Sequence, residues 1–405
     1  MATQAAVHLR AGQVALVPVC FTFAFLVVLP VFTDFGAGIT LSRPLPLGFI
    51  MSISLATLLI VAGVVRFPRR FLLLFLVFTS TLVLVLSVGL PNSHVPMQSL
   101  LHGFQVIVPF VGFIVSYVLF QRRRHLSAAG VGVVLALVLS SGVILSHNSD
   151  VVMSMGRWRF DEPILWGRFE VYQFRQYVGT VFAAALPLGL LAFRSMQGRL
   201  ALLVLGVLVA VTVFGMWTAA GRLMVLASLL VICASFVSRR QVLVVITVAA
   251  FIIMLLVFFL EPFRVEFLHA LARFADMGNR FPHWSRAWSE GWGGVFGTAY
   301  AISQGRESLS GAHNQLLSFL SRGGAFLVLT WVSLLFWMLL RAFTLLRVAT
   351  DSPLWWGYVG LATALLFQSI LNGVIAVPFE QPYTALFIWF VYGLVERAYR
   401  IESSR

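Results

Sequence analysis

The stretch His313-Asn-Gln-Leu-Leu-Ser-Phe-Leu-Ser-Arg322-Gly-Gly324 joins the most polar part of the chain to a long apolar run. Leu316, Leu317 and Leu320 recur at helical spacing and continue into residues 326–340 without a break. This periodicity predicts that His313 lies about one turn inside a helix that then enters a membrane.

The segment before this helix, residues 261–323, concentrates polar side chains between two long hydrophobic runs. It contains six arginines: Arg264, Arg273, Arg280, Arg286, Arg306 and Arg322. It also contains three histidines: His269, His283 and His313. We predict that the rest of the chain supports this segment.

The composition is that of an integral membrane protein. Hydrophobic residues make up 60% of the chain, charged residues only 10%, and the mean hydropathy is +0.96. Globular proteins carry about 25% charged residues. The formal charge of +14 comes from arginines distributed among loops, which argues against nucleic acid as a partner. Cys20 and Cys233 both lie in apolar runs, so no disulfide framework or cysteine zinc site is expected.

Apolar runs of about 20 residues, the length that crosses about 30 Å of hydrocarbon, recur along the whole sequence. They begin near Val14, Leu47, Phe71, Gln98, Ser127, Gln176, Leu200, Leu223, Val242, Ala325, Trp355 and Tyr383. We therefore predict an all-α polytopic integral membrane protein, a single transmembrane domain over residues 1–405 with about twelve transmembrane helices.

The short basic loops predict the orientation. Arginines mark every second connection: Arg66, Arg69, Arg70, Arg122, Arg123, Arg124, Arg194, Arg199, Arg239, Arg240, Arg341 and Arg347. By the positive-inside rule these loops and both termini face the cytoplasm. Two longer connections, a loop over 147–174 and a large loop over 261–323, then lie on the outer side of the membrane.

Arginine in these outward segments runs against the usual charge bias and suggests an anionic ligand. The 147–174 loop and the span that follows it carry Arg157, Arg159, Arg168 and Arg175, interleaved with aromatic residues. Guanidinium groups fork phosphate and aromatic faces cover sugar rings, which suits a phosphorylated glycan. Alternatively, the aromatic residues form a belt at the bilayer interface with no ligand at all.

Two parts of the large loop have recognisable patterns. Residues 261–276 alternate apolar and polar faces at helical spacing, which predicts a short helix on the membrane surface. The helical pattern breaks after Gly278. The glycine-rich segment from Gly291 to Gly297 then predicts a loop whose backbone closely approaches another group.

The order of these motifs resembles the bacterial O-antigen ligase and O-antigen polymerase superfamily. The matching elements are Gly221-Arg222 at the outer end of a span, an Arg-x-x-x-Trp element from Arg280 to Trp284, the step from Gly294 to Gly297, and His313-Asn314 followed by Leu317, Leu320 and Gly323. Alanine precedes Gly221 where the family usually has serine, and the proline often found before the glycine step is absent.

This resemblance implies a GT-C-like inverting glycosyltransferase of lipopolysaccharide biosynthesis. Such an O-antigen ligase moves polysaccharide from undecaprenyl diphosphate to a sugar hydroxyl of the lipid A-core acceptor. It implies His313 as the catalytic base, and Arg222 and Arg280 as the catalytic arginines that hold the diphosphate. Arg286 is the alternative to Arg280. Further substrate-binding residues would be Arg157, Arg159, Arg168, Arg175, Arg286, Asn314 and Trp284.

No metal or other cofactor is expected. The outward acids include no Asp-x-Asp pair, and arginines can neutralise a diphosphate without a cation. An ordinary structural alternative for His313 is a histidine at a helix start that bonds a loop carbonyl.

Several functions remain open. O-antigen polymerases and protein O-oligosaccharyltransferases share the same pattern of motifs. A transporter or flippase of an anionic lipid-linked glycan is the alternative from another class. Against a transporter, we find no charged residue inside the predicted spans and no internal repeat. The candidates for a polar interior are His102, Gln105, Gln368 and Asn372.

Overall fold

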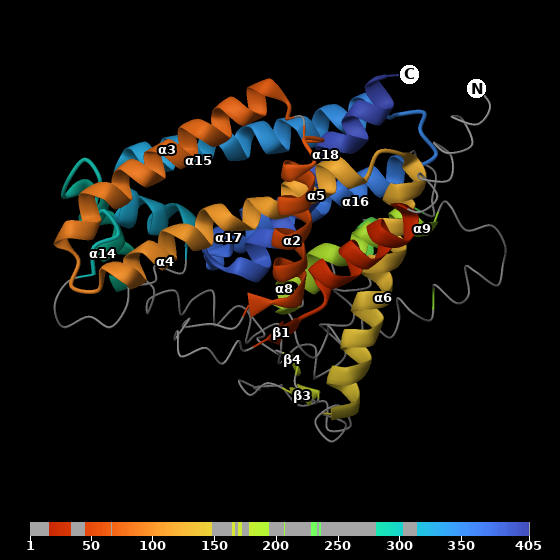
Figure 1. Ribbon diagram of the computed structural model, residues 1–405, viewed down its shortest axis with the longest axis horizontal. Coiled ribbons are helices and arrows are strands. Elements are labelled where there is room, and N and C mark those ends of the chain that lie inside the picture. Colours follow the sequence, from red (N-terminus) through yellow and green to blue (C-terminus); the bar gives the residue numbers. More distant parts are fainter. Residues whose placement is uncertain are drawn as a thin grey trace, which may run out of the picture.

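The fold is known from a computed structural model, which describes residues 16–33, 45–65, 67–147, 164–166, 169–171, 178–193, 206, 228–232, 235, 281–302 and 314–404. These residues form a bundle of long helices with one small sheet (Figure 1).

Five described helical segments have the length and composition to cross a membrane. The first is Arg69–Asn92, which comprises α3 (Arg69–Gly89) and η1 (Leu90–Asn92), and the second is Pro96–Leu119, which comprises α4 (Pro96–Ile107), η2 (Val108–Phe110) and α5 (Val111–Leu119). The third and fourth are α6 (Arg123–His147) and α15 (Gln315–Val348). The fifth is Trp355–Val374, which comprises α16 (Trp355–Leu366), η5 (Phe367–Leu371) and most of α17 (Asn372–Ile375). Shorter apolar helices span Leu16–Val28, Leu47–Val61 (α2) and Val178–Ala192. Together with α18 (Pro382–Ser403), they correspond to nine of the predicted runs. The runs near Leu200, Leu223 and Val242 lie almost entirely outside the described residues.

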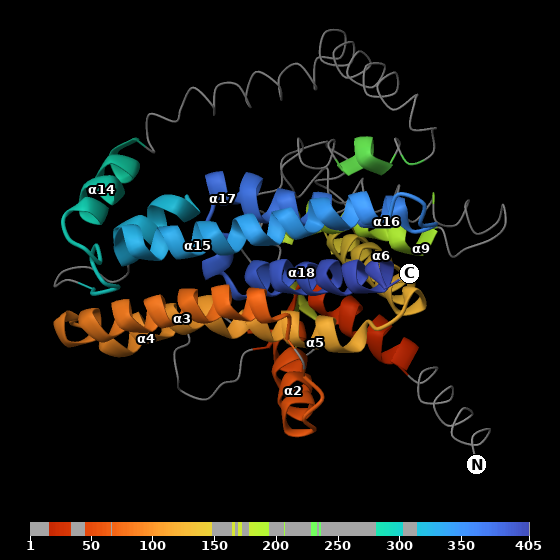
Figure 2. The ribbon, with the colours of Figure 1, turned by 90° about the horizontal axis from the view of Figure 1, so that it is seen from above.

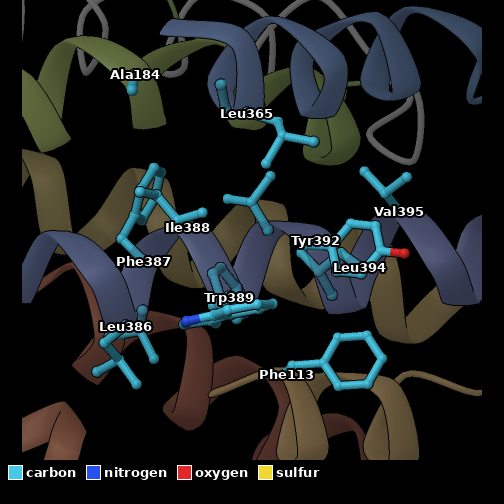
Figure 3. Close-up of a cluster of buried hydrophobic side chains, with 14 of the residues drawn as sticks. Phe113, Ala184, Leu365, Leu386, Phe387, Ile388, Trp389, Tyr392, Leu394 and Val395 are labelled. Atoms are coloured by element: carbon cyan, nitrogen blue, oxygen red, sulfur yellow. The ribbon is translucent and has the colours of Figure 1, made fainter. Parts of the chain in front are cut away.

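Helix α18 is the centre of the bundle. Every residue from Tyr383 to Val395 is buried, and most of these side chains have no exposed surface. A helix that is buried on all sides must be surrounded by other helices. Figure 2 shows α18 between α15 on one side and α3 and α5 on the other. Trp389 and Tyr392 pack against aromatic rings from α3, η2 and α5, among them Phe113 at 5.4 Å from Tyr392 (Figure 3).

A small antiparallel sheet departs from the all-α prediction. Its strand order is β2-β1-β4-β3, with β1 at Val31–Thr33, β2 at Leu45–Pro46, β3 at Ile164–Trp166 and β4 at Phe169–Val171. Strand β1 pairs with β4 through Val31 opposite Val171. These strands are two or three residues long, too short to show a period of two in the sequence. The sheet ties the predicted 147–174 loop to the end of the first helix.

The two ends of the bundle carry different charge pairs. Arg322 pairs with Glu380 near the starts of α15 and α18, whereas Arg341 pairs with Glu396 further along both helices. Helices α15 and α18 therefore run in the same direction. Nineteen residues separate the two arginines, which corresponds to roughly 28 Å along a helix. We call the end near Glu396 and Arg123 the basic end, and the other the polar-loop end.

Helix α15 is divided by Gly324. This residue has φ 66° and ψ −171°, which breaks the helix between its first turns and a straight apolar section. This break corrects the prediction that the helical pattern continues into residues 326–340 without interruption, although it lies directly before Ala325, where the apolar run was predicted to begin. A loop over residues 293–302 packs into the kink, where Thr298 N donates to Ser321 O at 2.7 Å and Tyr300 N donates to Arg322 O at 3.0 Å.

The glycine-rich segment makes the close backbone approach that its sequence predicts, and the group it approaches is α15. A Cβ on Gly297 would lie 2.4 Å from Ser321 O, and one on Gly291 would lie 2.5 Å from Leu320 Cγ. Gly297 also has a positive φ of 55°. These glycines therefore allow the loop to pack closely against the first turns of α15.

The substitution Gly324→Ala should destabilise the protein strongly. A Cβ at this position would lie 2.2 Å from Val295 O, and a backbone at φ 66° and ψ −171°, which essentially only glycine adopts, itself costs an L-residue about 1–3 kcal/mol. Thermal unfolding of the purified protein in detergent measures the effect as a lower Tm. Gly142→Ala, inside the last turns of α6, is the matched control, because no described residue outside the backbone of its own helix has an atom within 4 Å of the added Cβ. It should leave Tm unchanged or raise it.

Candidate functional site

The start of α15 is capped by Asn314. Its Oδ1 accepts from the backbone N–H of Leu317 at 3.1 Å, which is the bond of a helix N-cap. Its Nδ2 donates to the carbonyl of Val374 at the end of α17, at 3.2 Å. Both ends of the amide are thus engaged in fixing where the helix begins. That Asn314 binds substrate stays a prediction.

This cap corrects the predicted position of His313. The sequence placed His313 about one turn inside the helix, but the first helical residue is Gln315, and Asn314 has an extended backbone with φ −152°. The asparagine side chain accepts from one of the first backbone N–H groups, so the helix begins directly after it and does not extend further toward the N-terminus. His313 itself lies outside the described residues, immediately before the cap.

A buried network of charged and polar groups anchors the first turns of α15. Gln315 Nε2 donates to Glu380 Oε1 at 3.1 Å, and Gln315 Oε1 accepts from the backbone N–H of Phe379 at 2.9 Å. Arg322, two turns further along the same face, forms an ion pair with the other oxygen of Glu380. The side chains of Arg322 and Glu380 are 6% and 5% exposed. Burial at this level makes each charge dependent on its partner.

The position of Glu380 also suits the dipole of the helix. The carboxylate is hydrogen-bonded by Gln315, the first residue of α15, and negative charge is favoured beside a helix N-terminus. Glu380 lies in η6 (Pro378–Glu380), directly before α18. The network therefore joins the starts of two helices and holds the backbone beside His313 in one place.

Tyr300 lies beside Arg322 in this network. Its ring lies 5.9 Å from the guanidinium of Arg322, and the residue has no exposed surface. Burial, followed by the charge of Glu380, raises the pKa of Tyr300. The hydroxyl therefore stays protonated, and within the described residues it has no hydrogen-bond partner. A buried hydrogen-bond donor without a partner normally costs about 1–3 kcal/mol of folding free energy, so the Tyr300 hydroxyl is unusual for a buried polar group.

A second polar group lies in the neighbouring span. The helix formed by α16 and α17 is interrupted by η5, a π-helical segment, and π-helical turns are frequent at functional sites. Gln368 within it is fully buried, and neither amide atom has a partner in the described residues. Asn372 donates to Thr180 Oγ1 of α8 (Val178–Ala185) at 3.3 Å. Two of the residues predicted for a polar interior are thus confirmed as buried.

Residues expected to be irregular form helix α14, Phe281–Trp292. Proline at its second position is compatible with a first turn, and the aromatic residues recur at helical spacing. Ala287 and Gly291 are buried on the side that packs on α15, whereas the adjoining side exposes Phe281, Trp288 and Trp292 by 61%, 53% and 59%. This exposed aromatic face fits the predicted belt at the bilayer interface.

Of the predicted substrate-binding residues, Trp284 and Arg286 lie on α14. Trp284 is half-buried and its ring contacts Phe281 at 6.1 Å. Arg286 is 52% exposed and donates to Glu290 at 3.0 Å, an ion pair within one helix. An exposed pair of this kind contributes only a few tenths of a kcal/mol, about 0.2–0.5 kcal/mol, so Arg286 stays accessible to other ligands.

Most of the predicted site lies outside the described residues. These positions are Arg157, Arg159, Arg168, Arg175, Arg222, Arg280 and His313, and the surface helix predicted over 261–276 lies outside as well.

The sequence pattern does not predict the buried network. Arg322 falls within the predicted 261–323 loop, and a single amide side chain such as Gln315 has no sequence pattern that marks it as buried or functional. A signal did exist for Glu380. It is the only acid between the last two predicted spans and stands between Pro378 and Pro382, where the chain turns sharply.

No family model and no curated protein matches this chain. Among solved structures it is similar to a chain from work described as "Structural coordination of polymerization and crosslinking by a peptidoglycan synthase complex". The two chains share 17% identity with a TM-score of 0.47, over 84% of this chain and 99% of the other. A likeness at this level assigns neither a family nor an activity. Its five described helical segments that are long and apolar enough to cross a membrane indicate that the chain is a polytopic and predominantly helical membrane protein.

Proposed function

We propose that this protein is a metal-independent inverting glycosyltransferase of the O-antigen ligase type. It would move O-antigen polysaccharide from undecaprenyl diphosphate to a sugar hydroxyl of the lipid A-core acceptor. The observation that carries this proposal is the buried network of Gln315, Arg322 and Glu380 at the capped start of α15. It gives the His313-Asn314 motif a rigid support of the kind that a catalytic group needs.

In this proposal the chemistry is divided among a base and two cations. His313 takes the proton from the attacking hydroxyl, a contribution of roughly 10²–10⁴ in rate. Arg222 and Arg280 bind the leaving diphosphate and stabilise the charge that develops as the sugar–phosphate bond breaks. Arg286 remains the alternative for the second cation, because α14 leaves it exposed.

The proposed location is the periplasmic face of the inner membrane. Among the described residues, Arg69, Arg70, Arg122, Arg123 and Arg124 stand at starts of helices toward the basic end, opposite the polar-loop end. With the basic end in the cytoplasm, as the positive-inside rule expects, the start of α15 faces outward.

Two kinds of alternative remain. An O-antigen polymerase or a protein O-oligosaccharyltransferase would use the same donor chemistry with another acceptor. A transporter is supported by one observation, the π-helical break with buried Gln368 in a span, because transporters use interrupted helices near the bilayer centre.

Deletion of the gene separates a ligase from a polymerase and from a flippase. A ligase deletion should leave lipid A-core without O-antigen on a lipopolysaccharide gel, while lipid-linked polymer accumulates on the periplasmic side. Core capped with a single repeat unit would identify a polymerase. Lipid-linked glycan retained on the cytoplasmic side would identify a flippase, and an unchanged ladder would contradict all three. Complementation with the wild-type gene is the control.

A further inference from the structure

The basic end of the bundle contains a pocket that the proposed glycosyl transfer does not use. It lies between the link that joins α5 to α6 and the last turn of α18, and its volume is about 420 Å³. Its lining residues are Gln121, Arg122, Arg123, Arg124, Ile401 and Ser404. Three consecutive arginines thus line one pocket at the start of a membrane span.

The middle arginine is committed to the fold. Arg123 donates to Glu402 through Nε at 2.8 Å and through Nη2 at 2.5 Å. Glu402 also accepts from the hydroxyls of Tyr358 at 2.7 Å and Ser352 at 3.3 Å. Three of these four bonds are accepted by Oε1 and one by Oε2. Arg123 and Glu402 therefore hold each other in place on one side of the pocket, and the single negative charge of Glu402 is already balanced by Arg123.

Arg122 and Arg124 are exposed and unneutralised. Within the described residues neither side chain takes part in an ion pair. Two other acids belong to this end of the bundle. Asp351, next to Ser352, is exposed and forms no ion pair with Arg122 or Arg124. Glu396 is fully buried and accepts from Arg341 at 2.9 Å and from Tyr392 at 2.8 Å. The pocket therefore has an excess of positive charge, which calls for an anionic ligand.

Further cations strengthen this potential. The guanidinium groups of Arg397 and Arg400 lie over the ring of Tyr117, at 5.6 and 5.0 Å from its centroid. The N-terminus of the 25-residue helix α6 adds its partial positive charge at the same place. Stacking fixes two of these arginines on the protein, so the field does not depend on mobile side chains alone.

We propose that this pocket binds the phosphate group of an anionic lipid headgroup. Arginine forks suit phosphate oxygens, and a cluster of basic residues directly beside a span is attracted to an anionic leaflet. The pocket stands where α6 enters its apolar section, and Ile401 gives it one apolar wall. A phosphate carried on a lipid satisfies both the charged and the apolar lining, whereas free phosphate satisfies only the charged one.

The test compares two pairs of arginines in the full-length protein. Native mass spectrometry of the detergent-purified protein is used to measure Kd for short-chain phosphatidylglycerol, with phosphatidylcholine as the zwitterionic reference. The variant R122Q/R124Q should bind phosphatidylglycerol about tenfold more weakly or worse, since each basic residue near a membrane contributes about a factor of five. The matched control is R69Q/R70Q, also two exposed arginines at the start of a span.

If the pocket binds the lipid, R69Q/R70Q should bind phosphatidylglycerol within about twofold of the wild type. Phosphatidylcholine should bind weakly to every variant. Equal losses in both variants would mean that general positive charge, and not the pocket, attracts the lipid. Full binding by R122Q/R124Q would exclude the pocket directly. Displacement of the lipid by inorganic phosphate at an equal concentration would assign the site to free phosphate and overturn the lipid. Unchanged Tm in both variants shows that folding is not the cause.

Discussion

His313→Ala should lower turnover of lipid-linked donor by about 10²-fold or more, because proton transfer to a positioned base contributes roughly 10²–10⁴. Donor affinity should survive, since His313 does not hold the diphosphate in the proposed mechanism. A purified assay with undecaprenyl-diphosphate-linked glycan measures both quantities, the rate by product formation and Kd by titration of the donor. A loss in rate alone is the signature of a group that acts only in the transition state.

Lysine substitutions provide the comparison. Arg222→Lys and Arg280→Lys keep the charge but lose the planar fork, so both donor affinity and rate should fall. Arg286→Lys should retain both if Arg280 is the second cation, and should fail in its place if Arg286 is. Normal turnover in a folded His313→Ala protein, or a complete loss of donor binding, would assign the base to another residue.

Glu380→Ala should produce the largest loss of stability of any single substitution in the described polar network. Removal of the carboxylate leaves Arg322 charged and only 6% exposed, and an uncompensated buried charge costs about 3–5 kcal/mol. Gln315 loses a partner in the same step. Chemical or thermal unfolding in detergent measures the change. For a protein of marginal stability, this effect should appear as poor expression or a sharply lower Tm.

The double variant Arg322→Met/Glu380→Leu separates stability from activity. Replacing both charges by apolar side chains should restore most of the lost stability, because buried ion pairs are often no better than well-packed hydrophobic residues. The variant should still turn over slowly, since Gln315 can no longer fix the start of α15 through Glu380. Full activity in the double variant would show that the network has no part in positioning His313. Arg286→Ala is the exposed control, because its pair with Glu290 contributes only about 0.2–0.5 kcal/mol.

The candidate site shows where local patterns stop being informative. Leucine periodicity correctly predicted a helix after His313, but the prediction that it continues into residues 326–340 without a break was wrong, because Gly324 kinks it. The predicted start was wrong, because Asn314 accepts from Leu317 N as the N-cap and the helix therefore begins more than one turn later than the prediction for His313 required. Helix α14 was missed for a related reason. Proline and glycine at its two ends outweighed the helical spacing of its aromatic residues.

The membrane spans are the part of this protein that its sequence determined by itself. Hydropathy adds up residue by residue over about 20 neighbours, so the spans could be located without knowing what each helix contacts. The glycine-rich approach was also predictable, since a cluster of glycines signals close backbone contact whatever the partner is.

Only the tertiary structure decided which distant groups meet. Arg322 and Glu380 are 58 residues apart, and β1 pairs with a strand more than 130 residues later. No local pattern encodes such a pairing, because it depends on how whole helices pack around α18. A charge that hydropathy assigns to a loop becomes a buried ion pair once a second helix closes over it, and burial is a property of the assembled bundle.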